Sequence, residues 1–169
     1  MGMTNPSRTF LLAALFVSLL LVSVAYHSGR RSTRVGDIAP ALSFDSKPSD
    51  ALRALRGKYV LLNFWSSTNA PSREAVDRYT AWVERQPNSG IGLLSFNFDK
   101  SELLFREIVK RDGLNQQLQF RLSDKRMEQL MRDYNLRQGQ YGTLLIAPDG
   151  RIIAHNPDPA DLTDLISER

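Results

Sequence analysis

Two patterns of apolar residues alternate along residues 36–169: short unbroken runs and longer stretches with helical spacing. The strongest unbroken runs are YVLLNFW at 59–65 and IGLLSFNF at 91–98. Both are rich in β-branched and aromatic residues, which is typical of strands buried on both faces of a sheet. Shorter apolar stretches predict further extended segments at 41–44, 120–122, 141–147 and 151–155. The last two flank a Pro-Asp-Gly tripeptide, which favours a hairpin turn.

The stretch after the first strong run has the spacing of an amphipathic helix. Ser66 to Asn69 are turn and cap formers, Pro71 suits a first helical turn, and the pattern continues to about Gln86. A period of 3.6 residues places one set of apolar residues on a common face. This predicted inner face comprises Ala75, Val76, Tyr79, Trp82 and Val83.

Four more helical segments are predicted from caps and apolar spacing. Ser101 is expected to cap a helix that ends near Asp112, and Asp158 to cap a last helix that starts at Pro159. Another helix is expected at 125–134, and one short turn at 51–55 after Ser49 or Asp50. The predicted inward residues of these helices are Leu104, Phe105, Ile108, Val109, Met127, Leu130, Met131, Leu162, Leu165 and Ile166.

Strands separated by helices imply parallel crossovers, whereas the terminal hairpin is antiparallel. The order of elements therefore predicts an α/β sandwich with a mixed central sheet covered by helices on both faces. The segment from 36 to 169 is long enough for one sizeable core.

A separate apolar segment, FLLAALFVSLLLVSVAY, runs from Phe10 to Tyr26 without a charge. Its 17 residues are close to the minimum for a bilayer span. We expect a transmembrane anchor at 10–26, preceded by a cytoplasmic N-terminus at 1–9 and followed by a polar linker at 27–35. A cleaved signal peptide is the second interpretation, because Ser23 and Ala25 are small residues where a signal peptidase reads. A buried core helix is the third.

The charge of the chain is concentrated beside this segment. The net charge of +4 comes from Arg8, Arg30, Arg31 and Arg34, and the rest of the chain has 18 basic and 18 acidic residues. Nucleic-acid binding needs a basic patch on the folded domain, so we do not expect it. Counting Lys and Arg favours keeping the C-terminal side inside the cell, whereas the signal-like position of the segment favours export.

Composition limits the chemistry further. The chain has no cysteine, which excludes disulfides, thiolate metal sites, Fe–S clusters and cysteine catalysts. Only two histidines are present, so we expect no metal and no cofactor. A nucleophilic Ser67 or Ser72 would need a nearby base, and His155 is the sole histidine after residue 35. Asp99 is interpreted as a cap or turn residue, since no second carboxylate lies at ligand spacing.

Three stretches together resemble the thioredoxin-like superfamily, and in particular the membrane-anchored TlpA/ResA-like proteins and the adjoining AhpC/TSA group. They are GDIAP at 36–40, LRGKYVLLNFW at 55–65 and LLIAPDGRI at 144–152. The resemblance covers residues 36–169 and implies a three-layer thioredoxin-like fold. It also favours export of this domain, which we expect on the periplasmic side of the bacterial inner membrane, or soluble in the periplasm after cleavage.

The family's catalytic residues are where this chain departs from the resemblance. Redox members carry C-x-x-C at the start of the first long helix, where the helix N-terminus lowers the pKa of the first thiol. Alignment on FW and Arg73 places Asn69 and Ser72 at those two positions. A cis-proline normally faces the dithiol, but Tyr141 or Gly142 stands there, so we expect a trans peptide bond.

The simplest interpretation of Asn69 and Ser72 is helix capping, and the alternative is a helix N-terminus that binds an anion or a ligand carbonyl. A possible ligand groove that would suit an extended peptide comprises Trp65, Thr68, Asn69, Ser72, Tyr141 and Gly142. Trp65 and Tyr141 are otherwise core or rim aromatics.

The expected function is binding by a redox-silent domain in the cell envelope, with a protein or peptide partner. The first alternative is a thiol-disulfide oxidoreductase or peroxiredoxin-family enzyme that uses a thiol supplied by its partner. The second is a structural subunit of a membrane complex.

Overall fold

The computed structural model describes residues 33–42, 55–137 and 139–167. The chain divides into two units, Met1–Arg31 and Ser32–Arg169, and the described residues belong to the second. The predicted anchor at 10–26, and the predicted turn at 51–55 apart from Leu55, therefore lie outside the described residues. None of the helices within those residues has the length and apolar character that crossing a bilayer requires.

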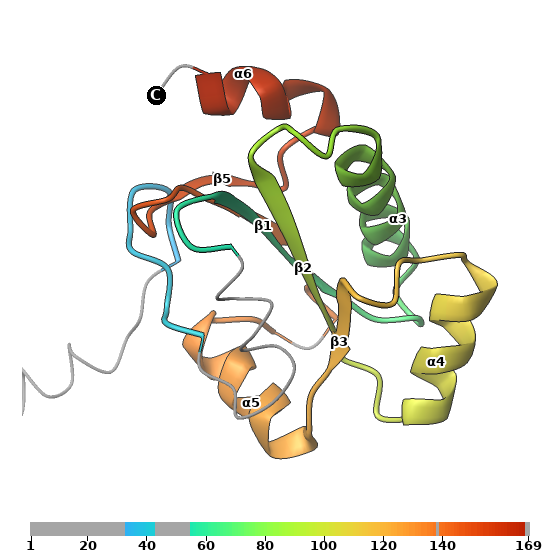
Figure 1. Ribbon diagram of the computed structural model, residues 1–169. Coiled ribbons are helices and arrows are strands. Elements are labelled where there is room, and N and C mark those ends of the chain that lie inside the picture. The colour runs from blue at the N-terminus through green and yellow to red at the C-terminus, as the bar shows by residue number, and fades with distance from the viewer. Residues whose placement is uncertain (1–32, 43–54, 138, 168–169) are drawn as a thin grey trace, which may run out of the picture. The chain divides into compact units, whose positions relative to one another are not determined.

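Five strands form one mixed sheet in the order β3-β2-β1-β4-β5 (Figure 1). They are β1 (Tyr59–Trp65), β2 (Ile91–Asn97), β3 (Gln119–Arg121), β4 (Thr143–Ile146) and β5 (Ile152–His155). The strands β1, β2 and β3 pair in parallel, and β4 pairs antiparallel with both β1 and β5. The predicted mixed sheet and terminal hairpin are confirmed.

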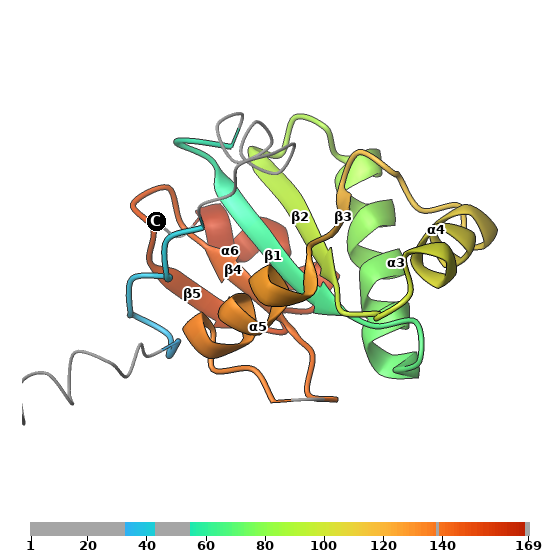
Figure 2. The same ribbon diagram turned by 90° about the horizontal axis from the view of Figure 1, so that it is seen from below.

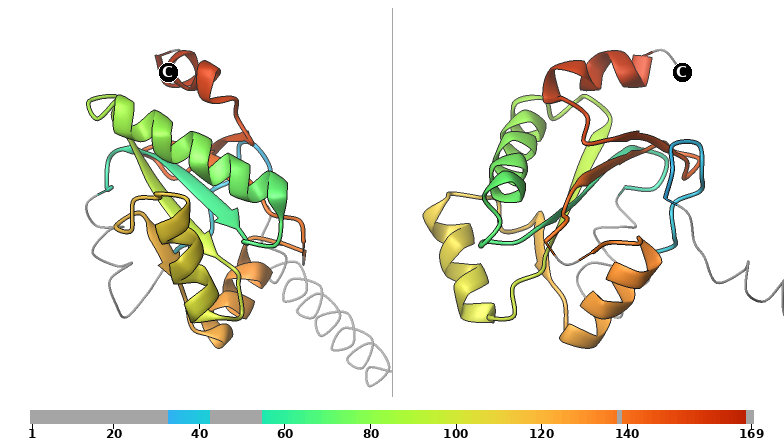
Figure 3. Two further views of the ribbon diagram at one scale, coloured as in Figure 1. Left: turned by 90° about the vertical axis from the view of Figure 1, so that its right-hand side faces the viewer. Right: turned by 180° about the vertical axis from the view of Figure 1, so that it is seen from behind.

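Helices cover both faces of this sheet. They are α3 (Ala70–Arg85), α4 (Glu102–Arg111), α5 (Asp124–Asp133) and α6 (Leu162–Ser167), the last preceded by a short 3₁₀ turn, η1 (Pro159–Asp161). Figures 2 and 3 show α5 on one side of the sheet and α3 on the other. The three predicted layers are therefore present.

Alternation along β1 divides the core between these two faces. Leu62 and Phe64 face α5 and pack with Leu130 and Tyr134, whereas Leu61 lies on the α3 side. The α3 side contains two clusters, one around Tyr79 and Trp82, and another around Trp65 and Phe105. Strands with apolar residues on both faces thus lie at the centre of the sheet, as their sequences predict.

Two sequence predictions of local structure are wrong. Leu104 was expected to face inward, but it is 40% exposed, because the buried stripe of α4 consists of Phe105, Ile108 and Val109 and leaves Leu104 at its margin in the first turn. The expected strand at 41–44 is absent at residues 41 and 42, and its other half lies outside the described residues.

Candidate functional site

The candidate site is the turn between β1 and α3, where two capping side chains organise the first turn of the helix. Asn69 is the N-cap of α3, and its Oδ1 accepts a hydrogen bond from the Ser72 backbone N–H at 2.9 Å. The Ser72 hydroxyl donates to the Asn69 carbonyl at 3.0 Å and accepts from the Ser66 backbone N–H at 3.2 Å. Both predicted capping residues are thus used to satisfy free backbone groups of the turn.

A buried carboxylate holds this turn against the end of β2. Asp99 is 5% exposed, and its Oδ1 accepts from the Ser66 hydroxyl at 2.7 Å and from the Ser67 backbone N–H at 3.0 Å. Its Oδ2 accepts from the Asn97 side-chain amide at 3.0 Å. Asp99 is therefore a turn residue, as interpreted from the sequence, and it also ties two loops together.

Arg121 fixes the loop that carries Asp99. Its Nε donates to the Asp99 carbonyl at 2.8 Å, and its Nη2 donates to the Lys100 carbonyl at 2.6 Å. The Arg121 side chain is only 12% exposed and also pairs with Glu102 and Asp124. Because a guanidinium presents several donors in a fixed plane, it can hold both carbonyls of a short loop at once.

The other rim of the site is the segment before β4. The Asn69 side-chain Nδ2 donates to the Gly139 carbonyl at 3.2 Å, which joins this segment to the start of α3. The half-buried ring of Tyr141 packs on Phe98, with ring centroids 5.6 Å apart. No cis peptide bond occurs in the described residues, so the predicted trans bond at Tyr141 and Gly142 is confirmed.

The neighbours of Gly142 leave no room for a larger side chain at this position. Its carbonyl accepts from the Phe64 backbone N–H at 2.9 Å, and a Cβ added to Gly142 would lie 2.8 Å from Asn156 Oδ1. That same oxygen accepts from the Thr143 backbone N–H at 2.7 Å. A larger residue at this position would displace the Asn156 side chain and its hydrogen bond.

The structure separates the six predicted groove residues into exposed and buried members. Thr68 is exposed, and Asn69, Tyr141 and Gly142 are half-buried around the turn. Ser72 is 5% exposed, and Trp65 is completely buried against Phe105. Trp65 therefore does not line an open groove, and its interpretation as a core aromatic is the correct one.

Ionisable groups near the site are few. An ion pair joins the first turn of α3 to the end of α4: the Arg73 guanidinium donates to both carboxylate oxygens of Asp112, with an Nη2–Oδ1 distance of 2.7 Å. The hydrogen bond from Arg73 lowers the pKa of Asp112, and the same bond raises the pKa of Arg73. His155 is exposed at the end of β5, and no hydrogen bond joins it to a serine in the part of the chain that the structure describes.

Sequence reasoning missed Asn97, Gly139 and Arg121. The sequence Asn97-Phe98-Asp99 at the end of β2 is an Asx-turn pattern, and it could have indicated the bond from the Asp99 N–H to Asn97 Oδ1 at 2.9 Å. Gly139 and Arg121 carry no local signal, because each reaches the site through tertiary contact.

The structure is similar to solved thioredoxin-like structures. It matches a crystal structure of a thioredoxin-like protein from Parabacteroides distasonis with 31% identity and a TM-score of 0.68, over 80% of this chain and 96% of that one. It also matches the thioredoxin domain of a thiol-disulfide oxidoreductase from Bacteroides vulgatus, with 22% identity and a TM-score of 0.64, over 81% and 98% of the two chains.

A third match is a thiol:disulfide interchange protein from Bacteroides sp., with 19% identity and a TM-score of 0.62, over 80% of this chain and 89% of that one. The second and third matches support the fold alone. No protein-family model and no curated protein matches the chain.

Proposed function

This chain belongs to the thioredoxin-like family, and from that premise we propose that it is a binding or accessory protein of the bacterial cell envelope. The observation that carries the proposal is the chemistry of the first turn of α3. Asn69 and Ser72 occupy the positions where the family resemblance implies two thiols, and both side chains cap the helix. An amide and a hydroxyl cannot exchange disulfides, since the thiolate is the reacting species.

The proposed binding surface is the exposed part of this turn. Thr68 and the half-buried side chains of Asn69 and Tyr141 lie around it, and the bond from Asn69 to Gly139 holds its two rims together. A surface of this kind, rigid and partly aromatic, suits an extended segment of a partner protein. In this proposal the segment 10–26 anchors the chain in the inner membrane, and the folded domain faces the periplasm.

Introducing two cysteines at the start of α3 tests whether the chain lacks only the thiols that disulfide exchange requires. We expect the wild-type chain in detergent micelles to leave the dithiothreitol-driven reduction of insulin at its uncatalysed rate. The double variant Asn69→Cys, Ser72→Cys should accelerate that reaction, because its first thiol lies at a helix N-terminus. Measurable catalysis by the wild-type chain would overturn the proposal.

Site-specific crosslinking tests the binding surface itself. A photoreactive amino acid at exposed Thr68 should capture a defined envelope protein in intact cells, identified by mass spectrometry. The same group at exposed Arg85, the last residue of α3, is the matched control and should not. Equal capture from both positions, or capture through residues 1–34 alone, would favour the structural-subunit alternative. Capture that depends on a partner's cysteine would favour the oxidoreductase that uses a partner's thiol.

A further inference from the structure

The two edges of the central sheet differ in whether another segment of the chain pairs with them. At the β5 edge, the Gly36 N–H donates to the Ile152 carbonyl at 2.8 Å, and the Ile152 N–H donates to the Asp37 carbonyl at 2.9 Å. Residues before the first strand therefore cover that edge. The sheet ends at β3 on its other side, and no described segment pairs with the outer side of that strand.

The register of β3 shows which of its backbone groups point outward. Ser95 pairs with Gln119, and the Ser95 N–H donates to the Leu118 carbonyl at 3.0 Å. In a parallel pair, one residue bonds to the two neighbours of its partner on the facing strand. The partner's own N–H and C=O then point to the opposite side. The Gln119 backbone groups therefore face away from β2, where a further strand would lie.

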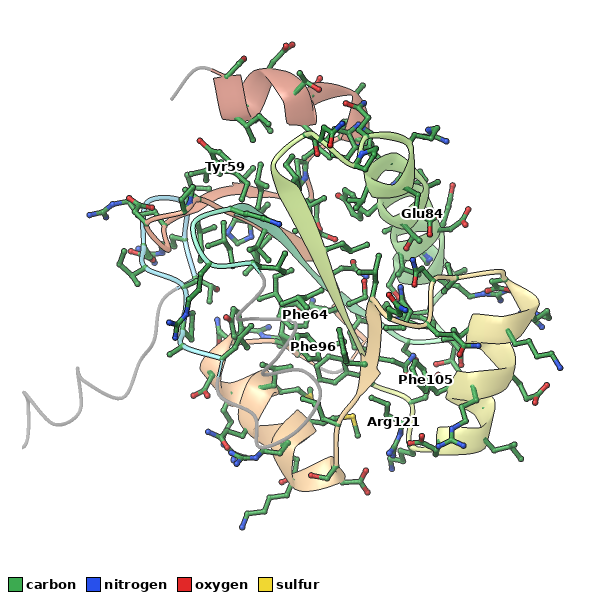
Figure 4. The ribbon with its side chains drawn as sticks, viewed as in Figure 1. Tyr59, Phe64, Glu84, Phe96, Phe105 and Arg121 are labelled. Carbon is green, nitrogen blue, oxygen red and sulfur yellow. The ribbon has the colours of Figure 1, made fainter. Side chains whose placement is uncertain are left out.

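A cavity of about 700 Å³ adjoins this edge, between α4 and β3. Phe105, Val109 and Phe120 form its apolar lining, and the remaining lining residues are charged residues of α4 and three glutamines, among them Gln119. Figure 2 shows α4 beyond β3, and Figure 4 shows the Phe105 side chain of α4 between that helix and β3. The volume falls within the range of about 300–1,000 Å³ that is usual for ligand pockets.

Gln119 adds an unmet hydrogen-bonding capacity at the same place. It is 5% exposed, and neither its Nε2 nor its Oε1 has a hydrogen-bond partner in the described residues. A buried carboxamide without partners costs folding free energy. Gln119 also lines the cavity, and a peptide group has both the acceptor and the donor that its carboxamide lacks.

We propose that an extended segment of a partner protein binds along the outer edge of β3 and places an apolar side chain in this cavity. The inference deepens the proposed binding function, on which it rests, by assigning a second contact surface. The backbone of Gln119 would pair with the segment, its carboxamide would bond to a peptide group, and Phe105 would contact the apolar side chain. This is strand addition with a pocket for selectivity.

The test begins with a displayed library of random seven-residue peptides, selected on the full chain in detergent micelles. Affinities of the selected synthetic peptides are then measured by fluorescence polarisation. We expect Gln119→Leu to weaken binding about fivefold through loss of the carboxamide bond. The same change should keep or raise the melting temperature, because it removes an unpaired buried group. Thr80→Val is the matched interior control and should leave affinity unchanged.

Backbone pairing is tested without altering the protein. N-methylation of the selected peptides at successive peptide bonds should abolish binding at alternate positions, because only every second N–H of an added strand faces β3. Loss of binding at every position or at none would contradict strand addition.

Other outcomes separate this surface from the turn before α3. Peptides whose binding is lost in Thr68→Arg but unchanged in Gln119→Leu would overturn this inference and leave the proposed function intact. An absence of selected peptides, or self-association of the chain through β3, would also overturn it. In each of these cases, the crosslinking experiment at Thr68 still tests the proposed function independently.

Discussion

Two groups of buried or half-buried polar residues, one at the start of α3 and one in the sheet beneath it, differ in how completely they are hydrogen-bonded. The turn cluster, consisting of Ser66, Asn69, Ser72, Asn97 and Asp99, has a hydrogen-bond partner for each of its side-chain polar atoms. The interior row crosses four strands beneath α3 and consists of Gln119, Ser95, Asn63 and Thr143, which are register neighbours.

The interior row has a single side-chain bond among its members in the described residues, from Thr143 Oγ1 to Asn63 Oδ1 at 2.7 Å. The Asn63 Nδ2, the Ser95 Oγ and both polar atoms of Gln119 have no partner there. Native proteins bond most buried polar groups, because an unpaired one costs about 1–3 kcal/mol. The turn cluster thus stabilises the start of α3, where the family resemblance implies two thiols, while the unpaired atoms of the interior row reduce stability.

The largest effect should come from removing the centre of the turn cluster. Asp99→Ala leaves the Ser66 hydroxyl, the Ser67 N–H and the Asn97 amide without their acceptor. We expect a loss of about 3 kcal/mol in the free energy of unfolding, because bonds to a charged acceptor are the stronger ones. Urea denaturation of the full chain measures it.

Asp99→Asn is the control for this change, because it retains one carbonyl oxygen in the same shape. Asp99→Asn should lower the free energy of unfolding clearly less than Asp99→Ala does. Equal losses, or a loss from Asp99→Ala below about 1 kcal/mol, would show that the cluster contributes little and remove the contrast with the interior row.

Two isosteric substitutions, one in β4 and one in α3, should change stability in opposite directions. Thr143→Val removes the donor to Asn63, whose side chain is completely buried, and should destabilise the protein by about 2 kcal/mol. Thr80 is 3% exposed and its hydroxyl has no partner in the described residues. Thr80→Val should therefore stabilise by about 1 kcal/mol. Shifts of equal sign in the melting temperature would contradict the distinction between bonded and unbonded groups.

The cap of α3 should contribute less than its buried neighbours. Asn69→Ala removes the acceptor for the Ser72 N–H and the donor to Gly139, at an expected cost of about 1 kcal/mol. Asn69→Asp retains the acceptor and adds a charge favoured at a helix N-terminus, so it should recover most of that loss. Recovery below half would indicate that the bond to Gly139 matters more than the cap.

These groups also show how far the sequence could predict the molecule. The bounds of β1 and the Asn69 cap follow from local signals: an apolar run buried on both faces, and a cap residue before Pro71. The contact of Ser66 with Asp99 does not, because it depends on the parallel register that pairs Trp65 with Asn97. The interior row likewise arises from register across strands that are far apart in sequence.

Trp65 shows a second limit of sequence reasoning. Its position at the end of a strand predicts either a groove residue or a core residue, and the position of α4 decides between them. That position is held by contacts such as Trp65 on Phe105 and Arg73 with Asp112, which join residues 40 and 39 positions apart. Local patterns contain no information on such pairs.

The smallest expected effect concerns the Arg73–Asp112 pair. This pair is bonded but partly exposed, so it shows what a hydrogen-bonded ion pair contributes to stability without full burial. The side chains are 34% and 17% exposed, and solvent screening limits the pair to about 0.5–1 kcal/mol at neutral pH. The bond from Arg73 lowers the pKa of Asp112 below its ordinary value of 3.8 in the folded state. The stabilisation is therefore complete above that ordinary value and is lost as the pH falls through the lower folded pKa.

Asp112→Asn should therefore destabilise the protein at pH 7 and match the wild type in strong acid. Urea denaturation at each pH measures the difference in the free energy of unfolding between the two proteins. A difference that stays constant across this pH range would mean that packing and not charge links α3 to α4.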